Sequence, residues 1–288
     1  MKPDFAEAHN NLGNILAHLT RYEEALGHYD LASTKASKAQ SLECLYAVGR
    51  YEEFNTRLNK ISMSDKKNIR IAAVSAFVAQ QLKQDDPYPF CKNPLDFVSL
   101  ESLGNYVSNV DAFIENIMSG VDNEHLIWEP QDQTTKLGYQ SLDNIFRNPD
   151  DYISKLGDII KDAINTYYSN FKSKNCVFIE AWPGQIRLYG GFNRLVQNGY
   201  QTAHIHPNGW LSGVVYLKTI ESPDPDEGAI EVGLHGYDLP ILDNQYPRKT
   251  YRPKKGDIIL FPSSLFHRTI PFTTDAERCV IAFDLHPV

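Results

Sequence analysis

The sequence has few cysteines, no long apolar run and no excess of positive charge. Its four cysteines, Cys44, Cys91, Cys176 and Cys279, are scattered over 288 residues without a C-x-x-C pair, which is typical of reduced thiols and not of a disulfide framework. No apolar stretch reaches the roughly 18 residues that a membrane-spanning helix needs, and the first residues lack the apolar core of a signal peptide. The net charge of −8 offers no electrostatic basis for binding nucleic acid or an anionic membrane. We therefore expect a cytoplasmic protein that binds neither.

Composition and length favour two globular domains. Hydrophobic residues make up 42% of the chain and charged residues 22%, which are globular values, and the length allows a sizeable core. The helical pattern ends near Gln84-Asp85-Asp86-Pro87-Tyr88-Pro89, because each proline disfavours helix at the residue before it. We predict a helical region over 1–84 and a second domain over 85–288.

Helical periodicity dominates the first region and predicts two helices, Phe5–Leu19 and Tyr22–Ser33. Their small and apolar residues resemble a tetratricopeptide repeat, which has L-G in its first helix and A-x3-[FY]-x2-A in its second. The matching residues are Leu12, Gly13, Ala25, Tyr29 and Ala32. His9 stands where the repeat usually has Trp, and an ordinary helical hairpin is the alternative.

A second, weaker copy of this pattern follows. Arg50-Tyr51-Glu52-Glu53-Phe54 echoes Arg21-Tyr22-Glu23-Glu24-Ala25 at an offset of 29 residues (50 − 21). A further helix is predicted over Lys66–Gln81, capped by Ser64-Asp65. Because fewer than three repeats rarely stand alone, we expect the array to lean on the domain behind it or to continue a preceding array. The resemblance implies either recruitment of a protein partner or a role in oligomerisation.

The second domain begins with mixed patterns and becomes β-rich after residue 175. An extended entry segment is predicted over 93–98, and helices over Leu103–Met118 and Tyr152–Tyr168. Short apolar runs punctuated by Pro and Gly predict strands at Cys176–Trp182, Ile186–Tyr189, Leu211–Leu217, Ala229–Val232, Thr250–Arg252, Asp257–Phe261 and Val280–Leu285. The pattern indicates an α+β fold, in which a β-sandwich or jelly roll carries helices outside.

Three histidines and an arginine carry the most informative chemistry. His204 and His206 lie at i and i+2, so in a strand they point to the same face. His267 follows an apolar strand, and Arg278 directly precedes another. Imidazole is the commonest protein ligand for transition metals, and a guanidinium pairs with a carboxylate through two hydrogen bonds. The alternative for each residue taken alone is structural: loop histidines and an ion-paired arginine.

Taken together, these residues fit a known order of motifs. The chain resembles the 2-oxoglutarate- and iron(II)-dependent oxygenases, most closely a bacterial and phage family with H-x-H-P-x-x-x-x-S-G-x-x-Y, G-D-x-x-x-F-P-S-x-x-x-H and R-x-x-x-x-F. The corresponding segments run from His204 to Tyr216, from Gly256 to His267 and from Arg278 to Phe283. Thr134–Gln140 and Trp182 also resemble the family. The resemblance covers roughly residues 88–288.

This resemblance implies a double-stranded β-helix that binds iron(II) and uses 2-oxoglutarate as cosubstrate. It implies that His204 and His267 bind the metal and that Arg278 binds the distal carboxylate of 2-oxoglutarate. Three further residues are either polar contacts to the cosubstrate or ordinary sheet packing: Ser212, Tyr216 and Thr269. Trp210 and Phe266 are expected in the core or the pocket wall.

One departure from the wider superfamily concerns the third metal ligand. Most members have H-x-D or H-x-E, and this chain has His206 at the carboxylate position. A site of three histidines would leave the iron with one more unit of positive charge than a 2-His-1-carboxylate triad. Either His206 binds the iron, or it lines the pocket while water or another acid completes the shell. None of the later acids Asp226, Glu227 and Glu231 has the usual spacing.

The resemblance therefore predicts that dioxygen oxidises two partners: 2-oxoglutarate is decarboxylated to succinate and carbon dioxide, with one oxygen atom entering succinate, and a substrate is hydroxylated with the other oxygen atom. The substrate, a small molecule or a protein, is not identified by the sequence. One alternative is a cupin-type metalloprotein that does not use 2-oxoglutarate, although it would give Arg278 no function. The other is a non-catalytic, repeat-bearing interaction protein with a degenerate barrel.

Overall fold

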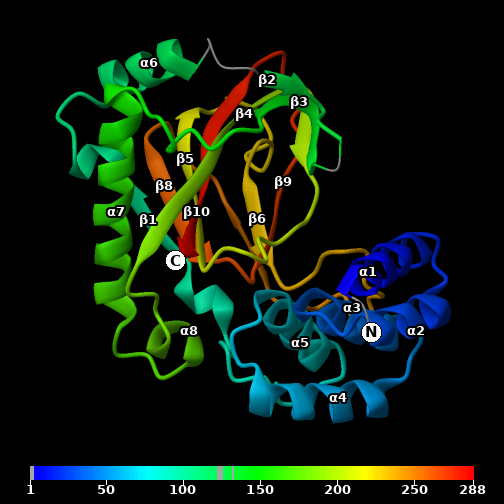
Figure 1. Cartoon of the computed structure of the whole chain (residues 1–288). Helices are drawn as coiled ribbons and strands as arrows, with labels where there is room; N and C mark the ends of the chain where they lie inside the picture. The colour runs from blue at the N-terminus through cyan, green and yellow to red at the C-terminus, as the bar shows by residue number, and fades with distance from the viewer. Residues whose placement is uncertain (1–2, 122–125, 132) are drawn as a thin grey trace. The chain divides into compact units, whose positions relative to one another are not determined.

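The computed structural model describes residues 3–121, 126–131 and 133–288 (Figure 1). The chain divides into two compact units. Unit 1 contains Met1–Lys92 and the separate segment Leu234–Tyr246, and unit 2 contains Asn93–Gly233 and Pro247–Val288. The division at 84/85 stays a prediction. No described helix is long and apolar enough to cross a membrane.

Unit 1 is built on helices, which are α1 (Pro3–His18), α2 (Tyr22–Ala32), α3 (Lys35–Ala47), α4 (Tyr51–Ser64) and α5 (Ile69–Gln81). The two helices predicted at the start of the chain are present as α1 and α2. Gly13 brings them together, since a Cβ there would overlap the Tyr29 ring. The cap predicted at Ser64-Asp65 is wrong. Ser64 ends α4, and α5 begins later because the Asn68 side chain accepts a hydrogen bond from the Ile71 amide.

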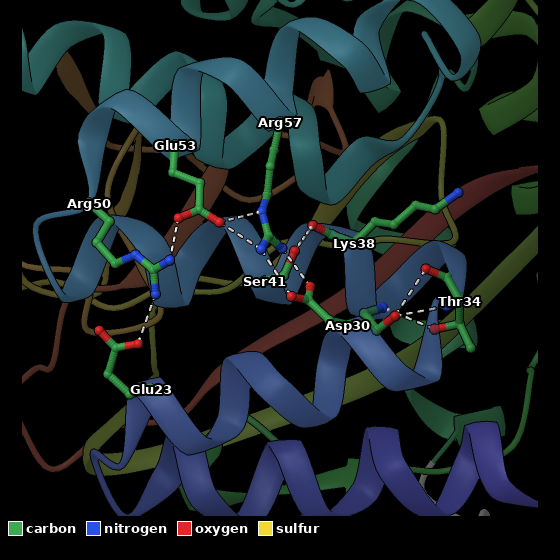
Figure 2. A network of polar contacts seen from close by, with 9 residues as sticks. Glu23, Asp30, Thr34, Lys38, Ser41, Arg50, Glu53 and Arg57 are labelled. Carbon is green, nitrogen blue, oxygen red and sulfur yellow. Dashed lines mark hydrogen bonds and ion pairs between the residues drawn. The ribbon is translucent and has the colours of Figure 1, made fainter.

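The echo between residues 21–25 and 50–54 corresponds to equivalent helix starts. Arg21 and Arg50 precede α2 and α4 with nearly the same backbone angles, φ −87° and ψ 59° against φ −83° and ψ 60°. Each arginine bonds the glutamate three residues later. Figure 2 shows that Arg50 also reaches Glu23, at 2.9 Å, which links α4 to α2. The assignment to tetratricopeptide repeats stays a prediction.

The segment Leu234–Tyr246 lies between two strands of unit 2 in the sequence but packs within unit 1. The Gln81 side chain accepts hydrogen bonds from the Leu242 and Asp243 amides and donates one to the Asp243 carbonyl. Tyr46 donates a hydrogen bond to the Pro240 carbonyl at 2.7 Å. Aromatic contacts of Phe77 with His235 and Tyr246 complete the packing. A long-range insertion of this kind has no signature in local periodicity.

Unit 2 is a double-stranded β-helix whose described strands form a larger and a smaller antiparallel sheet. The larger sheet has the order β1 (Ser99–Ser102), β8 (Asp257–Pro262), β5 (Leu211–Lys218), β10 (Arg278–Pro287), β4 (Ile186–Gln201), β3 (Thr135–Ser141) and β2 (Leu126–Trp128). The smaller sheet has the order β7 (Arg248–Tyr251), β6 (Ile230–Gly233) and β9 (Phe266–Thr269). The predicted jelly roll is confirmed, and β4 extends well beyond the predicted Ile186–Tyr189.

Helix α7 (Asp151–Phe171) lies beside the larger sheet (Figure 1). It begins where the Asp150 carboxylate accepts a hydrogen bond from the Ile153 amide. The Phe146 ring joins helix to sheet. A Cβ at Gly157 of α7 would lie 3.5 Å from the ring, in ordinary contact, and a Cβ at Gly190 of β4 would lie 2.7 Å from it, in overlap. The helix predicted over Tyr152–Tyr168 is therefore present and slightly longer.

Three local predictions in unit 2 are wrong. The extended segment predicted over 93–98 contains a 3-10 turn, η1 (Pro94–Phe97). The helix predicted from Leu103 begins later, as α6 (Val110–Val121), after a separate turn, η2 (Leu103–Asn105). The strand predicted over Cys176–Trp182 contains a short helix instead, α8 (Val177–Glu180).

Aromatic packing explains why α8 is helical. Phe178 lies within α8 and Trp182 lies two residues beyond its end, with ring centroids 5.6 Å apart. Trp182 stacks on Tyr167 of α7, and Phe178 stacks on Trp210. The apolar and aromatic run suits a strand by local preference, but the short helix and the turn after it let Phe178 and Trp182 join one aromatic cluster.

Candidate metal and cosubstrate site

The three predicted histidines lie together at one end of the smaller sheet. His204 follows β4 and pairs with His267 of β9 through two backbone hydrogen bonds of 3.1 and 3.0 Å. His206 is held by a hydrogen bond from its amide to the Ser263 carbonyl. One potential ligand atom from each of the three side chains lies within 4.8 Å of the other two. The spacing therefore suits a single metal ion.

Hydrogen bonds orient each imidazole in the same way. In all three rings Nδ1 faces an oxygen that can only accept, so Nδ1 carries the proton and Nε2 keeps its lone pair for a metal. The distances from Nδ1 are 2.7 Å to the Thr202 carbonyl for His204, 3.2 Å to the Leu265 carbonyl for His267, and 2.5 Å to the Asp284 carboxylate for His206.

The protonation preferences of the histidines differ. Burial, together with the neighbouring His206, lowers the pKa of His204 to about 3. Burial and the other two imidazoles lower the pKa of His267 well below its ordinary value. Both rings are therefore neutral at pH 7, as metal ligands must be. Burial also lowers the pKa of His206, but the charge and hydrogen bond of Asp284 outweigh it, so that this pKa is raised.

Asp284 is the site residue that sequence reasoning missed. It lies on β10, and Ser212 donates a hydrogen bond of 2.6 Å to its second oxygen. Burial raises the pKa of Asp284, but His206 more than offsets this and leaves it below the ordinary value. A signal was available: Asp284 lies six residues after Arg278 on one strand (284 − 278), and an even spacing places both on the same face.

Arg278 is buried, at 2% exposed, at the start of β10. Its Nε donates to the Gly228 carbonyl at 2.9 Å, and its guanidinium lies 5.0 Å from the centre of the Tyr216 ring. Among the described residues, Arg278 Nη1 and Tyr216 Oη have no hydrogen-bond partner. A buried cation without an anionic partner is costly, so this pair suits a ligand carboxylate.

The other predicted contacts lie in different places. Thr269 is buried on β9, two residues after His267 and on the same face. The Ser212 hydroxyl forms hydrogen bonds with Asp284 and Ser263. Ser212 lies opposite Asp284 in the sheet, near the end of β10, whereas Arg278 begins that strand. The cosubstrate roles of Ser212, Tyr216 and Thr269 stay predictions.

Several other residues raised by the sequence have structural contacts. Trp210 and Phe266 are buried in the core, as expected. The three later acids bond elsewhere: Asp226 with Arg252, Glu227 with Ser222 and Thr273, and Glu231 with Arg268.

A cavity of about 250 Å³ adjoins His206. Its lining includes Gln140, Tyr189, Asn193, Ala282 and Asp284, and no lysine or arginine is among the described residues that line it. Asn193 is 3% exposed, and its Oδ1 has no hydrogen-bond partner among the described residues. The cavity therefore offers hydrogen-bonding groups beside the histidines without an attraction for anions.

Comparisons with known proteins agree with the sequence resemblance. Residues 192–284 match the family model described as "Putative 2OG-Fe(II) oxygenase", which confirms that resemblance. A search of curated proteins found no significant match.

Solved structures give more distant likenesses. A Pseudomonas putida prolyl-4-hydroxylase is 13% identical, with 66% of this chain and 92% of that chain covered and a TM-score of 0.47. HygX from Streptomyces hygroscopicus, with nickel and 2-oxoglutarate bound, is 15% identical, with 69% and 88% covered and a TM-score of 0.46. A viral collagen prolyl hydroxylase from Paramecium Bursaria Chlorella virus-1 is 14% identical, with 67% and 96% covered and a TM-score of 0.45.

Proposed function

Proceeding from the match of residues 192–284 to the 2-oxoglutarate- and iron(II)-dependent oxygenases, we propose that the chain hydroxylates a substrate with iron(II) bound by His204, His206 and His267. The observation that carries this proposal is the convergence of three imidazoles whose Nδ1 atoms are all engaged. Imidazole nitrogen suits iron(II), and a shell with only three protein ligands leaves positions open for other ligands.

The proposed cosubstrate site lies at the start of β10, where Arg278 is located. Arg278 and Tyr216 would hold the distal carboxylate of 2-oxoglutarate, since each presents a buried polar atom without a partner and the guanidinium can pair with two carboxylate oxygens. Dioxygen would be the oxidant, and bound iron(II) together with 2-oxoglutarate would supply the means of activating it, which protein side chains lack. The histidines hold the metal and the arginine orients the cosubstrate, while the surrounding sheets exclude water.

The cavity beside His206 is the proposed substrate pocket. The unpartnered Asn193 oxygen favours a substrate group that donates a hydrogen bond, and the carboxylate of Asp143 in the lining disfavours anions. We further propose that the helical repeats of unit 1 recruit a protein partner or substrate. The free and mostly buried cysteines support a cytoplasmic location.

Anaerobic titration tests the oxygenase proposal. Addition of iron(II) and then 2-oxoglutarate should produce a visible charge-transfer band, and aerobic turnover should convert 2-oxoglutarate to succinate. A protein that binds iron(II) but neither binds nor decarboxylates 2-oxoglutarate would instead support the cupin-type alternative. A protein that binds no iron stoichiometrically would support the non-catalytic alternative.

A further inference from the structure

The proposed metal shell lacks a carboxylate. Three neutral imidazoles leave a divalent ion with its full charge, whereas two histidines and a carboxylate would neutralise one unit. A buried site with uncompensated charge is unfavourable, so another negative group near the ion would stabilise it. Asp226, Glu227 and Glu231 are engaged elsewhere.

Asp284 meets this need from behind His206. Its Oδ2 lies 2.5 Å from His206 Nδ1, on the side of the ring away from the metal-binding Nε2. A carboxylate that accepts from a metal-bound imidazole fixes the ring's orientation and increases the basicity of its other nitrogen. The negative charge of Asp284 therefore acts on the ion through the His206 ring and not by direct coordination.

The larger sheet holds Asp284 in this position. β10 pairs with β5 so that Asp284 lies opposite Ser212, whose hydroxyl donates to Asp284 Oδ1. Ser263 in turn contacts the Ser212 hydroxyl at 2.8 Å. The turn before β5 also packs closely against Asp284, since a Cβ at Gly209 would lie 3.2 Å from the carboxylate. Both carboxylate oxygens are thus engaged, and the side chain has one orientation.

We propose that Asp284 is a positioning residue that supplies, through His206, the negative charge that the H-x-H motif lacks. The inference rests on the proposed metal site. It gives His206 a defined role: the histidine and Asp284 together replace the single carboxylate of the usual triad. The competing explanation is that Asp284 only stabilises the sheet by its hydrogen bonds with His206 and Ser212.

Metal titration of the 288-residue apoprotein separates these explanations, with Co(II) as the probe and its visible absorption as the readout. Asp284→Asn keeps an oxygen that accepts from His206 and removes the charge. We expect it to weaken Co(II) binding by about 10- to 100-fold. Asp158→Asn is the control, because it removes an exposed carboxylate that pairs with Lys161 on α7, and it should leave Co(II) affinity within about twofold.

A charge relocation distinguishes electrostatics from folding. In the double variant His206→Asp with Asp284→Asn, the carboxylate moves to the ligand position, and Co(II) affinity should recover to within about tenfold of the wild type. Circular dichroism of each variant reports whether it is folded, and an unfolded Asp284→Asn protein that the added His206→Asp does not rescue contradicts the proposal. Unchanged affinity in Asp284→Asn also overturns it. Absence of Co(II) and iron(II) binding in the wild type would overturn the metal site itself, and this inference with it.

Discussion

At the residue scale, the orientation of the imidazoles decides what the site can do. His204 and His267 take their orientation from backbone carbonyls, and His206 takes its orientation from a carboxylate. Backbone acceptors hold a ring without adding charge, whereas Asp284 adds a full negative charge. The three proposed ligands are therefore alike in type but unequal in electronic environment.

Removal of His267 should abolish metal binding. His267→Ala deletes the one proposed ligand on β9 and leaves two nitrogens, which are too few to hold the ion firmly. We expect the affinity for iron(II) to fall by at least about 100-fold and the charge-transfer band to disappear, measured by anaerobic titration. The exposed His18 provides the control, and His18→Ala should behave as the wild type does.

Removal of Arg278 should weaken the binding of 2-oxoglutarate far more than the binding of iron(II). Arg278→Ala deletes a charged, bidentate partner, which costs roughly 2–5 kcal/mol, but leaves the histidines in place. Separate titrations of iron(II) and of 2-oxoglutarate measure the two effects, with the exposed pair of Arg252 and Asp226 providing Arg252→Ala as control. Equal loss of both ligands would contradict the assignment.

Metal affinity should fall as the pH is lowered. Asp284 raises the pKa of His206 above its ordinary value of 6.5, so one proton competes with the metal at a pH where His204 and His267 are already neutral. Below the pKa of His206 the apparent dissociation constant should rise about tenfold per pH unit. Titrations with Co(II) between about pH 5 and pH 8, which bracket the ordinary pKa of histidine, measure how the apparent dissociation constant changes with pH. A flat profile would show that His206 does not have to lose a proton.

At the element scale, α7 illustrates a helix whose start and length were predictable. Its apolar spacing and the preceding acids are local signals, and the structure adds the cap at Asp150. By contrast, α8 depends on rings from α7 and from the segment before β5. These tertiary contacts overrode the local preference for a strand. They come from segments distant in sequence, so local periodicity does not show them.

Loss of the α7 cap should destabilise the protein modestly. Asp150→Ala leaves the Ile153 amide without its acceptor, which costs about 1 kcal/mol. Urea unfolding followed by circular dichroism should show a lower midpoint. Asp158→Ala is the control, since its ion pair with Lys161 is exposed and contributes little. Equal effects of the two substitutions would argue against capping as the cause.

At the scale of the whole molecule, the two units are discontinuous in sequence. The segment Leu234–Tyr246 leaves β6, packs in unit 1 and returns to β7. Gln81 is its main polar anchor, with three hydrogen bonds to the backbone of Leu242 and Asp243. The stability of unit 1 therefore depends on a segment that is remote in the chain.

Substitution of Gln81 should loosen that segment. Gln81→Ala removes three part-buried hydrogen bonds to the backbone of Leu242 and Asp243, each worth roughly 0.5–1.5 kcal/mol. Hydrogen exchange should accelerate across 234–246 while the strands β5 and β10 stay protected. The neighbouring Gln80 is exposed, and Gln80→Ala should leave exchange unchanged. Uniform acceleration throughout the chain would contradict a local role.

By itself the sequence determined most of the helices and strands, the order of the motifs and the candidate ligands His204, His206, His267 and Arg278. These follow from residue chemistry and short-range spacing, which a linear chain displays directly. Only the tertiary structure decided the pairing of Asp284 with His206, 78 residues apart, the helical form of α8, and the place of Leu234–Tyr246 in unit 1. Each depends on strand register or on packing between distant segments, and local periodicity in the sequence determines neither of them.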